Sequence, residues 1–126
     1  MKVLIADDDR LVRTMLADLL ADLGHAVVAA EDGAQAVALC ARETPDLLIL
    51  DFLMPKLSGL DALHALREQG VRAPAVLLTA ISDGSIRAVE GAETVDVLLP
   101  KPVTRRTLAR ALAQALAQAT RPNGRP

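Results

Sequence analysis

Short apolar runs alternate with longer amphipathic segments along this chain. The apolar runs span residues 3–6, 26–30, 47–50, 75–78 and 95–99. They are largely continuous rather than alternating, which is typical of strands buried on both faces of a sheet. Regular alternation of such strands with helices predicts an α/β fold of the doubly wound (βα)5 kind, with a five-stranded parallel sheet covered by helices on both faces.

Between the runs, apolar residues recur at helical spacing and predict the connecting helices. The first helix is expected over residues 10–23, with Asp9 as its N-cap. Its apolar stripe consists of Leu11, Val12, Met15, Leu16, Leu19, Leu20 and Leu23. The second helix is expected to begin near Asp32, another N-cap, and to end before Pro45, which cannot continue it.

The remaining helices differ in the strength of their signals. The third begins at Ser58, because Ser58 and Asp61 have the S-x-x-D spacing of a helix start. The fourth, within residues 84–92, is weak because it contains glycine and serine, which are poor helix formers. The fifth is expected over residues 104–119, with leucines and alanines along one face and arginines in solvent.

Length and composition indicate one domain. The chain has 126 residues, of which 52% are hydrophobic, enough to build one packed core. We expect residues 1–120 to form this domain and residues 121–126 to be a disordered tail. Cys40 is the single cysteine and lies in an apolar helical stretch, so we expect it to be a buried structural thiol.

Composition also excludes several kinds of partner. Phe52 is the only aromatic residue, whereas proteins that stack nucleic-acid bases need several aromatic platforms. A net charge of −2 provides no attraction toward DNA or anionic lipid. The sequence shows neither a signal segment nor an apolar run of membrane-spanning length, so we expect a cytoplasmic protein that binds neither nucleic acid nor membrane.

Polar residues stand at the carboxyl ends of four predicted strands. Asp7 and Asp8 follow the first strand, Asp51 the third, Thr79 the fourth and Lys101 the fifth. The carboxyl ends of parallel strands meet at one edge of the sheet, where open α/β sheets bind their ligands. We therefore expect these side chains to share a pocket although they are far apart in the sequence.

Carboxylates gathered in one pocket repel each other. Two such charges about 4 Å apart cost about 4 kcal/mol at an effective dielectric constant near 20. A divalent cation offsets this repulsion, and hard oxygen ligands suit Mg²⁺. With Lys101 as a further positive charge, the pocket would bind an anion beside a metal, which is what phosphoryl transfer requires.

These residues carry a resemblance to the receiver domain of bacterial response regulators. The resemblance extends from residue 1 to about residue 119 and rests on a set of ordered motifs: Val3-Leu-Ile-Ala-Asp-Asp-Asp9, Leu48-Ile-Leu-Asp51, Met54-Pro55, Ser58-Gly59, Leu78-Thr79-Ala80 and Lys101-Pro102. It implies a flavodoxin-like fold with strand order 2-1-3-4-5. No single motif is specific, but all of them in order are.

The resemblance also implies the metal ligands. Asp8 and Asp51 would bind Mg²⁺ directly, and Asp7 would contribute mainly through water. The backbone carbonyl of Leu53 would be a further ligand.

A second set of roles concerns the phosphoryl group. Asp51 would take it from the phosphohistidine of a sensor histidine kinase or of a phosphotransfer protein. Lys101 would pair with the phosphoryl oxygens, Thr79 would move toward them, and the small Ala80 would leave access to the site. The peptide bond between Lys101 and Pro102 would be cis.

The implied protein is a phosphoacceptor switch of a two-component system and not an enzyme, apart from its own phosphorylation and dephosphorylation. Phosphorylation would change the face made by the fourth helix, the fifth strand and the fifth helix, where an unknown output partner docks. Self-association through the same helices is left open. Leu98 departs from the family because an aromatic residue usually stands there, which puts the usual relay in doubt. Leu53 and Ile81 flank the path of attacking water, and since both are apolar we expect slow dephosphorylation.

Three alternatives remain to be weighed against this reading. A haloacid-dehalogenase-type phosphatase would carry a second aspartate two residues after Asp51, where this chain has Leu53. A flavodoxin-like cofactor binder would need a phosphate-binding loop after the first strand, and three aspartates stand there instead. A degenerate receiver that docks partners without phosphorylation is kept as an alternative because of Leu98.

Overall fold

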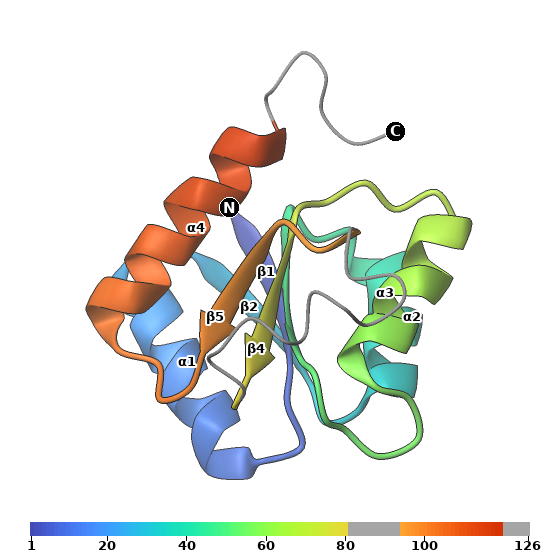
Figure 1. Ribbon diagram of the computed structural model, residues 1–126, viewed down its shortest axis with the longest axis horizontal. Coiled ribbons are helices and arrows are strands. Elements are labelled where there is room, and N and C mark those ends of the chain that lie inside the picture. The colour runs from blue at the N-terminus through green and yellow to red at the C-terminus, as the bar shows by residue number, and fades with distance from the viewer. Residues whose placement is uncertain (81–93, 120–126) are drawn as a thin grey trace.

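The computed structural model describes residues 1–80 and 94–119 (Figure 1). The predicted fourth helix within residues 84–92, Ile81 and the predicted tail at residues 121–126 lie outside the described residues. In the two described segments, no helix is both long and apolar enough to span a membrane.

Five parallel strands form the centre of the molecule (Figure 1). They are β1 (Lys2–Ala6), β2 (Ala26–Ala30), β3 (Leu47–Asp51), β4 (Ala75–Thr79) and β5 (Val97–Pro100). Their order in the sheet is β2-β1-β3-β4-β5. The predicted fold class and strand order are therefore confirmed, and the last strand begins two residues later than the apolar run that predicted it.

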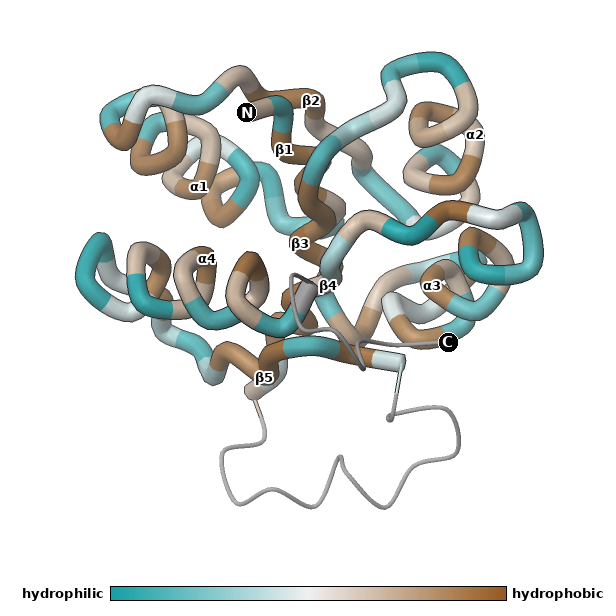
Figure 2. The backbone as a smooth tube through the Cα atoms, turned by 90° about the horizontal axis from the view of Figure 1, so that it is seen from above, coloured by the Kyte–Doolittle hydropathy of each residue, from teal (hydrophilic) through white to brown (hydrophobic). Residues whose placement is uncertain are grey.

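Four helices cover the sheet in the described part of the chain. They are α1 (Arg10–Asp22), α2 (Gly33–Glu43), α3 (Gly59–Glu68) and α4 (Arg105–Ala119), the last being the helix predicted over residues 104–119. Seen from above, α1 and α4 lie on one face of the sheet and α2 and α3 on the other (Figure 2). Each pair encloses its own apolar cluster against the sheet, one built around Leu16 and Leu108 and the other around Leu60 and Leu66.

Burial along the strands follows their place in the sheet. Every residue of β3 and β4 is buried, as the continuous apolar runs predict. The prediction of burial on both faces is wrong for β2, where Ala26 and Ala29 are exposed. The reason is topological, because β2 forms an edge of the sheet and pairs only with β1.

The first three helices begin directly after the capping residues that predicted their starts. Asp9 accepts the backbone N–H of Leu11 at 2.9 Å, and Ser58 accepts that of Asp61 at 3.1 Å. The Asp32 carboxylate caps α2 in the same way. Each cap satisfies an N–H that would otherwise have no partner in the first turn.

The predicted stripe of α1 is wrong at its first member. Leu11 is 80% exposed, whereas Leu16 and Leu20 are fully buried. A helix turns about 100° per residue, so Leu11 points about 140° away from Leu16 and about 180° away from Leu20. Cys40, by contrast, is buried as expected, and burial raises the pKa of its thiol to about 11.

Candidate functional site

The carboxyl ends of the strands bring the predicted polar residues together. Asp51 and Thr79 are the last residues of β3 and β4, and Asp7 and Lys101 directly follow β1 and β5. Asp7, Asp51 and Thr79 are the buried polar residues of the described chain, at 0%, 5% and 2% exposure. Carboxylate oxygens of Asp7, Asp8 and Asp51 lie within 4.8 Å of one another.

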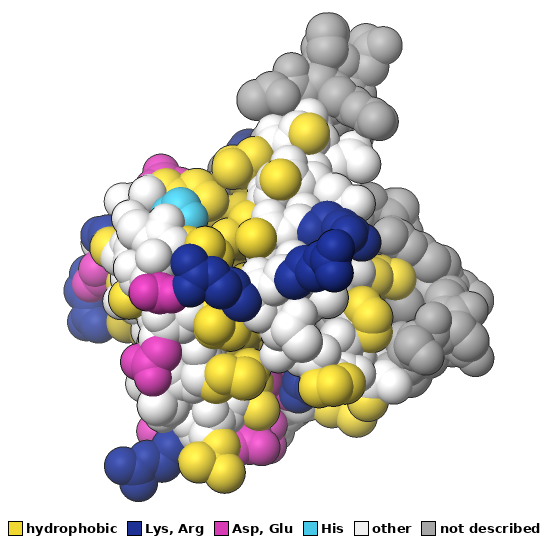
Figure 3. Space-filling view, turned by 90° about the vertical axis from the view of Figure 1, so that its left-hand side faces the viewer, with side chains coloured by type: hydrophobic (Ala, Val, Ile, Leu, Met, Phe, Trp, Pro, Cys, Tyr) yellow, Lys and Arg dark blue, Asp and Glu magenta, His cyan; other side chains and the backbone are white. Residues whose placement is uncertain are grey.

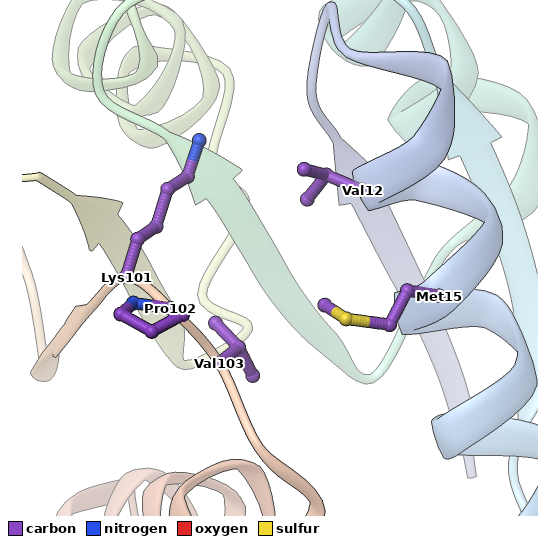
Figure 4. A pocket seen from close by; sticks show the side chains of 5 residues that line it. All are labelled: Val12, Met15, Lys101, Pro102 and Val103. Carbon is purple, nitrogen blue, oxygen red and sulfur yellow. The ribbon is translucent and has the colours of Figure 1, made fainter.

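Lys101 lies between two of these carboxylates. Its Nζ atom is 3.3 Å from Oδ2 of Asp7 and 3.2 Å from Oδ2 of Asp51. Its backbone N–H donates to the carbonyl of Thr79 at 2.8 Å, which ties the residue to the end of β4. The following peptide bond to Pro102 is cis, as expected. In Figure 4 the Lys101 amine points away from the neighbouring Pro102 and toward the end of the central strand.

The electrostatics of the site show a deficit of positive charge. Burial and the neighbouring Asp7 carboxylate raise the pKa of Asp51 to about 6, although the ammonium of Lys101 opposes the shift. Burial tends to lower the pKa of Lys101, but attraction to Asp51 and Asp7 outweighs it, and the pKa of Lys101 is raised. One ammonium group therefore does not balance the carboxylates around it.

The oxygens of Asp7 support a cation site. Oδ1 of Asp7 accepts the backbone N–H of Asp9 at 2.9 Å. Oδ2 of Asp7 is buried, and its ion-pair partner in the described part of the chain is the Lys101 ammonium, 3.3 Å away and shared with Asp51. The donor set of clustered carboxylates therefore fits a hard cation such as Mg²⁺.

A small pocket opens beside Asp51. It has a volume of about 90 Å³, several times the space that one water molecule requires. Its lining consists of Asp51, Phe52, Leu53, Thr79, Ala80 and Lys101. Leu53 is one of these residues and is 70% exposed, so an apolar side chain stands between the pocket and solvent.

A glycine fixes the loop between β3 and α3 that carries Leu53. A Cβ atom on Gly59 would lie 2.2 Å from the carbonyl oxygen of Asp51, closer than any side chain tolerates. The Gly59 N–H donates to the carbonyl of Phe52 at 3.0 Å. Because these backbones touch, the loop folds back tightly over the end of β3 and stays beside the site.

A larger apolar groove lies next to the site. It has a volume of about 390 Å³ and is lined by Val12, Met15, Lys101, Pro102 and Val103. Val12 and Met15 project from α1 toward the Pro102–Val103 segment across the opening (Figure 4). In Figure 3 hydrophobic side chains gather along the middle of the face that α1 and α4 form, with basic side chains on either side.

Several contacts at the site and groove were not predicted from the sequence. Arg105, predicted to be a solvated residue of the last helix, is exposed but forms an ion pair with Asp22 of α1. Arg13 of α1 donates from Nη1 to the carbonyl of Asp7 at 2.8 Å. No local sequence pattern predicts either contact, because each depends on where the two groups lie in the folded chain. Leu98 is half-buried and packs with the apolar cluster on the α2–α3 face.

Comparison with known proteins assigns the chain a family. Residues 3–113 match the family model described as the response regulator receiver domain. The curated relatives include the response regulator MprA of Mycobacterium leprae, 41% identical over 102 residues, and that of Mycobacterium avium, 40% identical over 102 residues. Each alignment covers 81% of this chain but 45% of the relative, so the chain spans less than half the length of these relatives.

Solved structures show the same fold. The chemotaxis protein CheY4 of Vibrio cholerae has a TM-score of 0.84 and 31% identity, with 90% of this chain and 97% of that chain covered. The response regulator TrrA of Thermotoga maritima, solved in complex with Mg²⁺ and BeF, has a TM-score of 0.82 and 28% identity over the same shares.

Proposed function

Because this chain belongs to the response regulator receiver domain family, we propose that Asp51 is its phosphoacceptor and that Asp7, Asp8 and Lys101 serve the transfer. The domain is a two-component signalling switch of the CheY-like kind. One observation carries the assignment of residues, namely that three carboxylates lie within 4.8 Å of one another and that a lysine lies 3.2 Å from one of them, Asp51.

The geometry suits a carboxylate nucleophile. A carboxylate oxygen of Asp51 would attack the phosphorus of a phosphohistidine, forming an O–P bond as the N–P bond breaks and leaving the imidazole with the electron pair. Since the pKa of Asp51 is about 6, the carboxylate is mostly ionised at neutral pH. Lys101 can then exchange its contact with the Asp51 carboxylate for one with the transferred oxygens, whose charge it neutralises.

The metal site belongs to the same proposal. Asp7, Asp8 and Asp51, together with the backbone carbonyl of Leu53 that the family resemblance implies, would hold Mg²⁺. When bound, Mg²⁺ supplies positive charge for the phosphoryl oxygens and for the clustered carboxylates. The complex of the related TrrA with Mg²⁺ and BeF supports this ligand chemistry.

Thr79 and Leu53 line the space beside the acceptor carboxylate. Thr79 is buried at the end of β4, from where its hydroxyl would move toward a phosphoryl oxygen and report its presence. Leu53 offers no group that orients water, so we expect the aspartyl-phosphate to hydrolyse slowly. The chemistry of the domain would be limited to its own phosphorylation and dephosphorylation.

The groove between α1 and the segment after Lys101 is our proposed docking site for the phosphodonor. Its apolar lining lies directly beside Asp51 and Lys101, so a sensor histidine kinase or phosphotransfer protein seated there would present its phosphohistidine to the pocket. We further propose that the protein is cytoplasmic and does not bind nucleic acid directly. Its output partner is yet to be identified. Self-association stays open.

A receiver that docks partners without phosphorylation is less well supported. Such a domain needs none of the buried charges of this pocket, and buried carboxylates are costly unless they serve a ligand. Leu98 concerns how the signal leaves the site and not whether Asp51 is phosphorylated.

The decisive experiment is labelling by acetyl phosphate in the presence of Mg²⁺. We expect the wild-type chain to be labelled, Asp51→Asn to lose labelling and Asp46→Asn, which changes an aspartate at the opposite end of β3, to keep it. Labelling is read by the mass increase of the intact protein. Equal labelling of wild type and Asp51→Asn would overturn the proposal.

A further inference from the structure

We propose that Arg13 is a positioning residue of the metal site, whose guanidinium holds the Asp7 backbone and thereby places the Asp8 carboxylate beside those of Asp7 and Asp51. The inference deepens the proposed function and rests on the metal site described there. It starts from the direct contact of an α1 side chain with the backbone between two metal ligands.

Arg13 folds back over the first turn of its own helix. Its Nη1 atom donates to the carbonyl oxygen of Asp7 at 2.8 Å, and its side chain is only 16% exposed. Its Nη2 atom lies 3.7 Å from a carboxylate oxygen of Glu31, the residue after β2. The guanidinium thus touches both the loop after β1 and the loop after β2.

Besides its ion pair with Lys101, Asp7 makes three hydrogen bonds. Its N–H donates to the carbonyl of Ala30 at 3.2 Å, and its Oδ1 accepts the N–H of Asp9 at 2.9 Å. Its carbonyl is held by Arg13. Of these three contacts, the one from Arg13 is made by a side chain outside the loop, so a single substitution in α1 removes it and leaves the ligand residues unchanged.

The Asp7 carbonyl controls Asp8 because both belong to one planar peptide unit. Asp8 is exposed, and within the described chain its carboxylate takes neither a hydrogen bond nor an ion pair. The backbone position therefore decides whether this carboxylate can reach the cluster that it forms with Asp7 and Asp51. A contact that fixes the peptide unit fixes the point from which the Asp8 side chain extends.

An arginine suits this task better than a lysine. The planar guanidinium carries several donors in fixed directions, so one nitrogen can hold the carbonyl while another faces Glu31. The Glu31 contact itself is weak, because that side chain is 71% exposed and 3.7 Å away. The carbonyl contact is the one that matters for the site.

Removal of the guanidinium should weaken metal binding without unfolding the domain. Substitution of groups that support metal ligands lowers metal affinity by about 10–100-fold. For Arg13→Met, which keeps the stem of the side chain, we expect a loss of about 10-fold, since the contacts of Asp7 with Ala30, Asp9 and Lys101 remain. Arg13→Lys keeps a donor and a charge and should lose less. Glu31→Gln should match the wild type.

The test is titration of the purified full chain with Mg²⁺ by isothermal calorimetry. The variants are Arg13→Met, Arg13→Lys and Glu31→Gln, with Arg110→Met as a control that removes an exposed arginine of α4. Circular dichroism and urea unfolding in EDTA check that each variant folds, and Arg13→Gln replaces Arg13→Met if the latter does not. Wild-type affinity in the folded Arg13 variant would overturn the inference.

A second readout separates positioning from a general structural role. Labelling by acetyl phosphate is followed over a range of Mg²⁺ concentrations. We expect Arg13→Met to need about 10-fold more Mg²⁺ for half-maximal labelling and to reach the wild-type rate at saturation. A rate that is reduced equally at every Mg²⁺ concentration would contradict positioning. Absence of Mg²⁺ binding by the wild type would overturn the metal site itself and this inference with it.

Discussion

Two ionic clusters lie at opposite ends of β4 and β5, and they are built differently. At the start of these strands, Arg67 of α3 lies 3.8 Å from Asp96, with side chains 11% and 6% exposed. Arg67 also donates to the carbonyls of Val71 and Ala73 at 2.9 and 2.7 Å, and Asp96 accepts the N–H of Ala75 at 2.7 Å. Here a cation pairs with an anion, and backbone groups add further partners.

At the other end of the same strands, negative charge exceeds positive charge. Asp7 and Asp51 are buried and share one lysine, and Asp8 stands close by. Burial and the Asp7 carboxylate raise the pKa of Asp51 to about 6, although the Lys101 ammonium opposes the shift. The comparison teaches that burial of charge alone does not mark a site. A balanced cluster holds strands together, and an unbalanced one needs a ligand.

The largest expected effect comes from breaking the balanced cluster. Arg67→Met removes the guanidinium that lies 3.8 Å from the buried Asp96 carboxylate and two hydrogen bonds to backbone carbonyls. Loss of one partner of a buried ion pair costs about 3–5 kcal/mol. We expect the free energy of unfolding, measured in urea, to fall by about 3 kcal/mol, while the affinity of the folded protein for Mg²⁺ stays the same. Arg72→Met, at an exposed neighbour, should change stability by less than about 0.5 kcal/mol. Equal free energies of unfolding for Arg67→Met and Arg72→Met would contradict the stabilising role of the balanced cluster.

In the unbalanced cluster, removal of a charged group should raise the free energy of unfolding instead of lowering it. Without metal at pH 7, Asp51→Asn removes a buried like charge, so we expect the free energy of unfolding to rise by on the order of 2 kcal/mol. Urea unfolding in EDTA measures this gain. Addition of Mg²⁺ should stabilise the wild type and not the variant, which shrinks the difference. A variant that is less stable than the wild type in EDTA would contradict the assignment of charge excess.

The same difference should depend on pH with a defined sign. The pKa of Asp51 is about 6 in the folded chain against the ordinary 3.8, so the folded state binds more protons between these values. The contribution of Asp51 to stability is therefore fully present below pH 3.8 and is lost as pH rises through about 6. The advantage of Asp51→Asn should accordingly vanish near pH 4 and level off above pH 6. A stability difference between wild type and Asp51→Asn that stays constant from pH 4 to above pH 6 would contradict the raised pKa of Asp51.

The smallest effect concerns the mouth of the unbalanced site. Leu53→Asn places an amide at the pocket where it can orient water, so we expect the phosphorylated protein to lose its phosphoryl group several-fold faster. The decay is followed by intact mass after acetyl phosphate is removed. Leu11→Asn is a matched control, because Leu11 is similarly exposed, at 80% against 70% for Leu53, and is not among the residues that line this pocket. An unchanged decay in Leu53→Asn would show that this position does not gate water.

The sequence predicted most of what depends on local chemistry. The strands, the caps at Asp9 and Ser58 and the meeting of polar residues at the strand ends all follow from short-range patterns and from the geometry of parallel sheets. Leu11 and the edge strand β2 were mispredicted, because an apolar residue says nothing about whether a neighbour exists to cover it.

Three arginine contacts were beyond prediction. Arg67 and Arg105 each bind a carboxylate that is far away in the sequence, so packing sets its position. Arg13 binds a carbonyl close by in the sequence, but no sequence pattern indicates that its side chain folds back toward it. The roles in phosphoryl transfer of all the site residues remain predictions, namely those of Asp7, Asp8, Asp51, Leu53, Thr79 and Lys101.

The burial of Cys40 has a practical consequence for observing the switch. Its thiol is 3% exposed with a pKa of about 11, so it reacts poorly with maleimides at neutral pH. The chain also lacks tryptophan and tyrosine. A cysteine introduced at an exposed position can therefore be labelled selectively with a dye, without removal of Cys40. A single introduced tryptophan would supply all of the tryptophan fluorescence. Either reporter needs only one substitution.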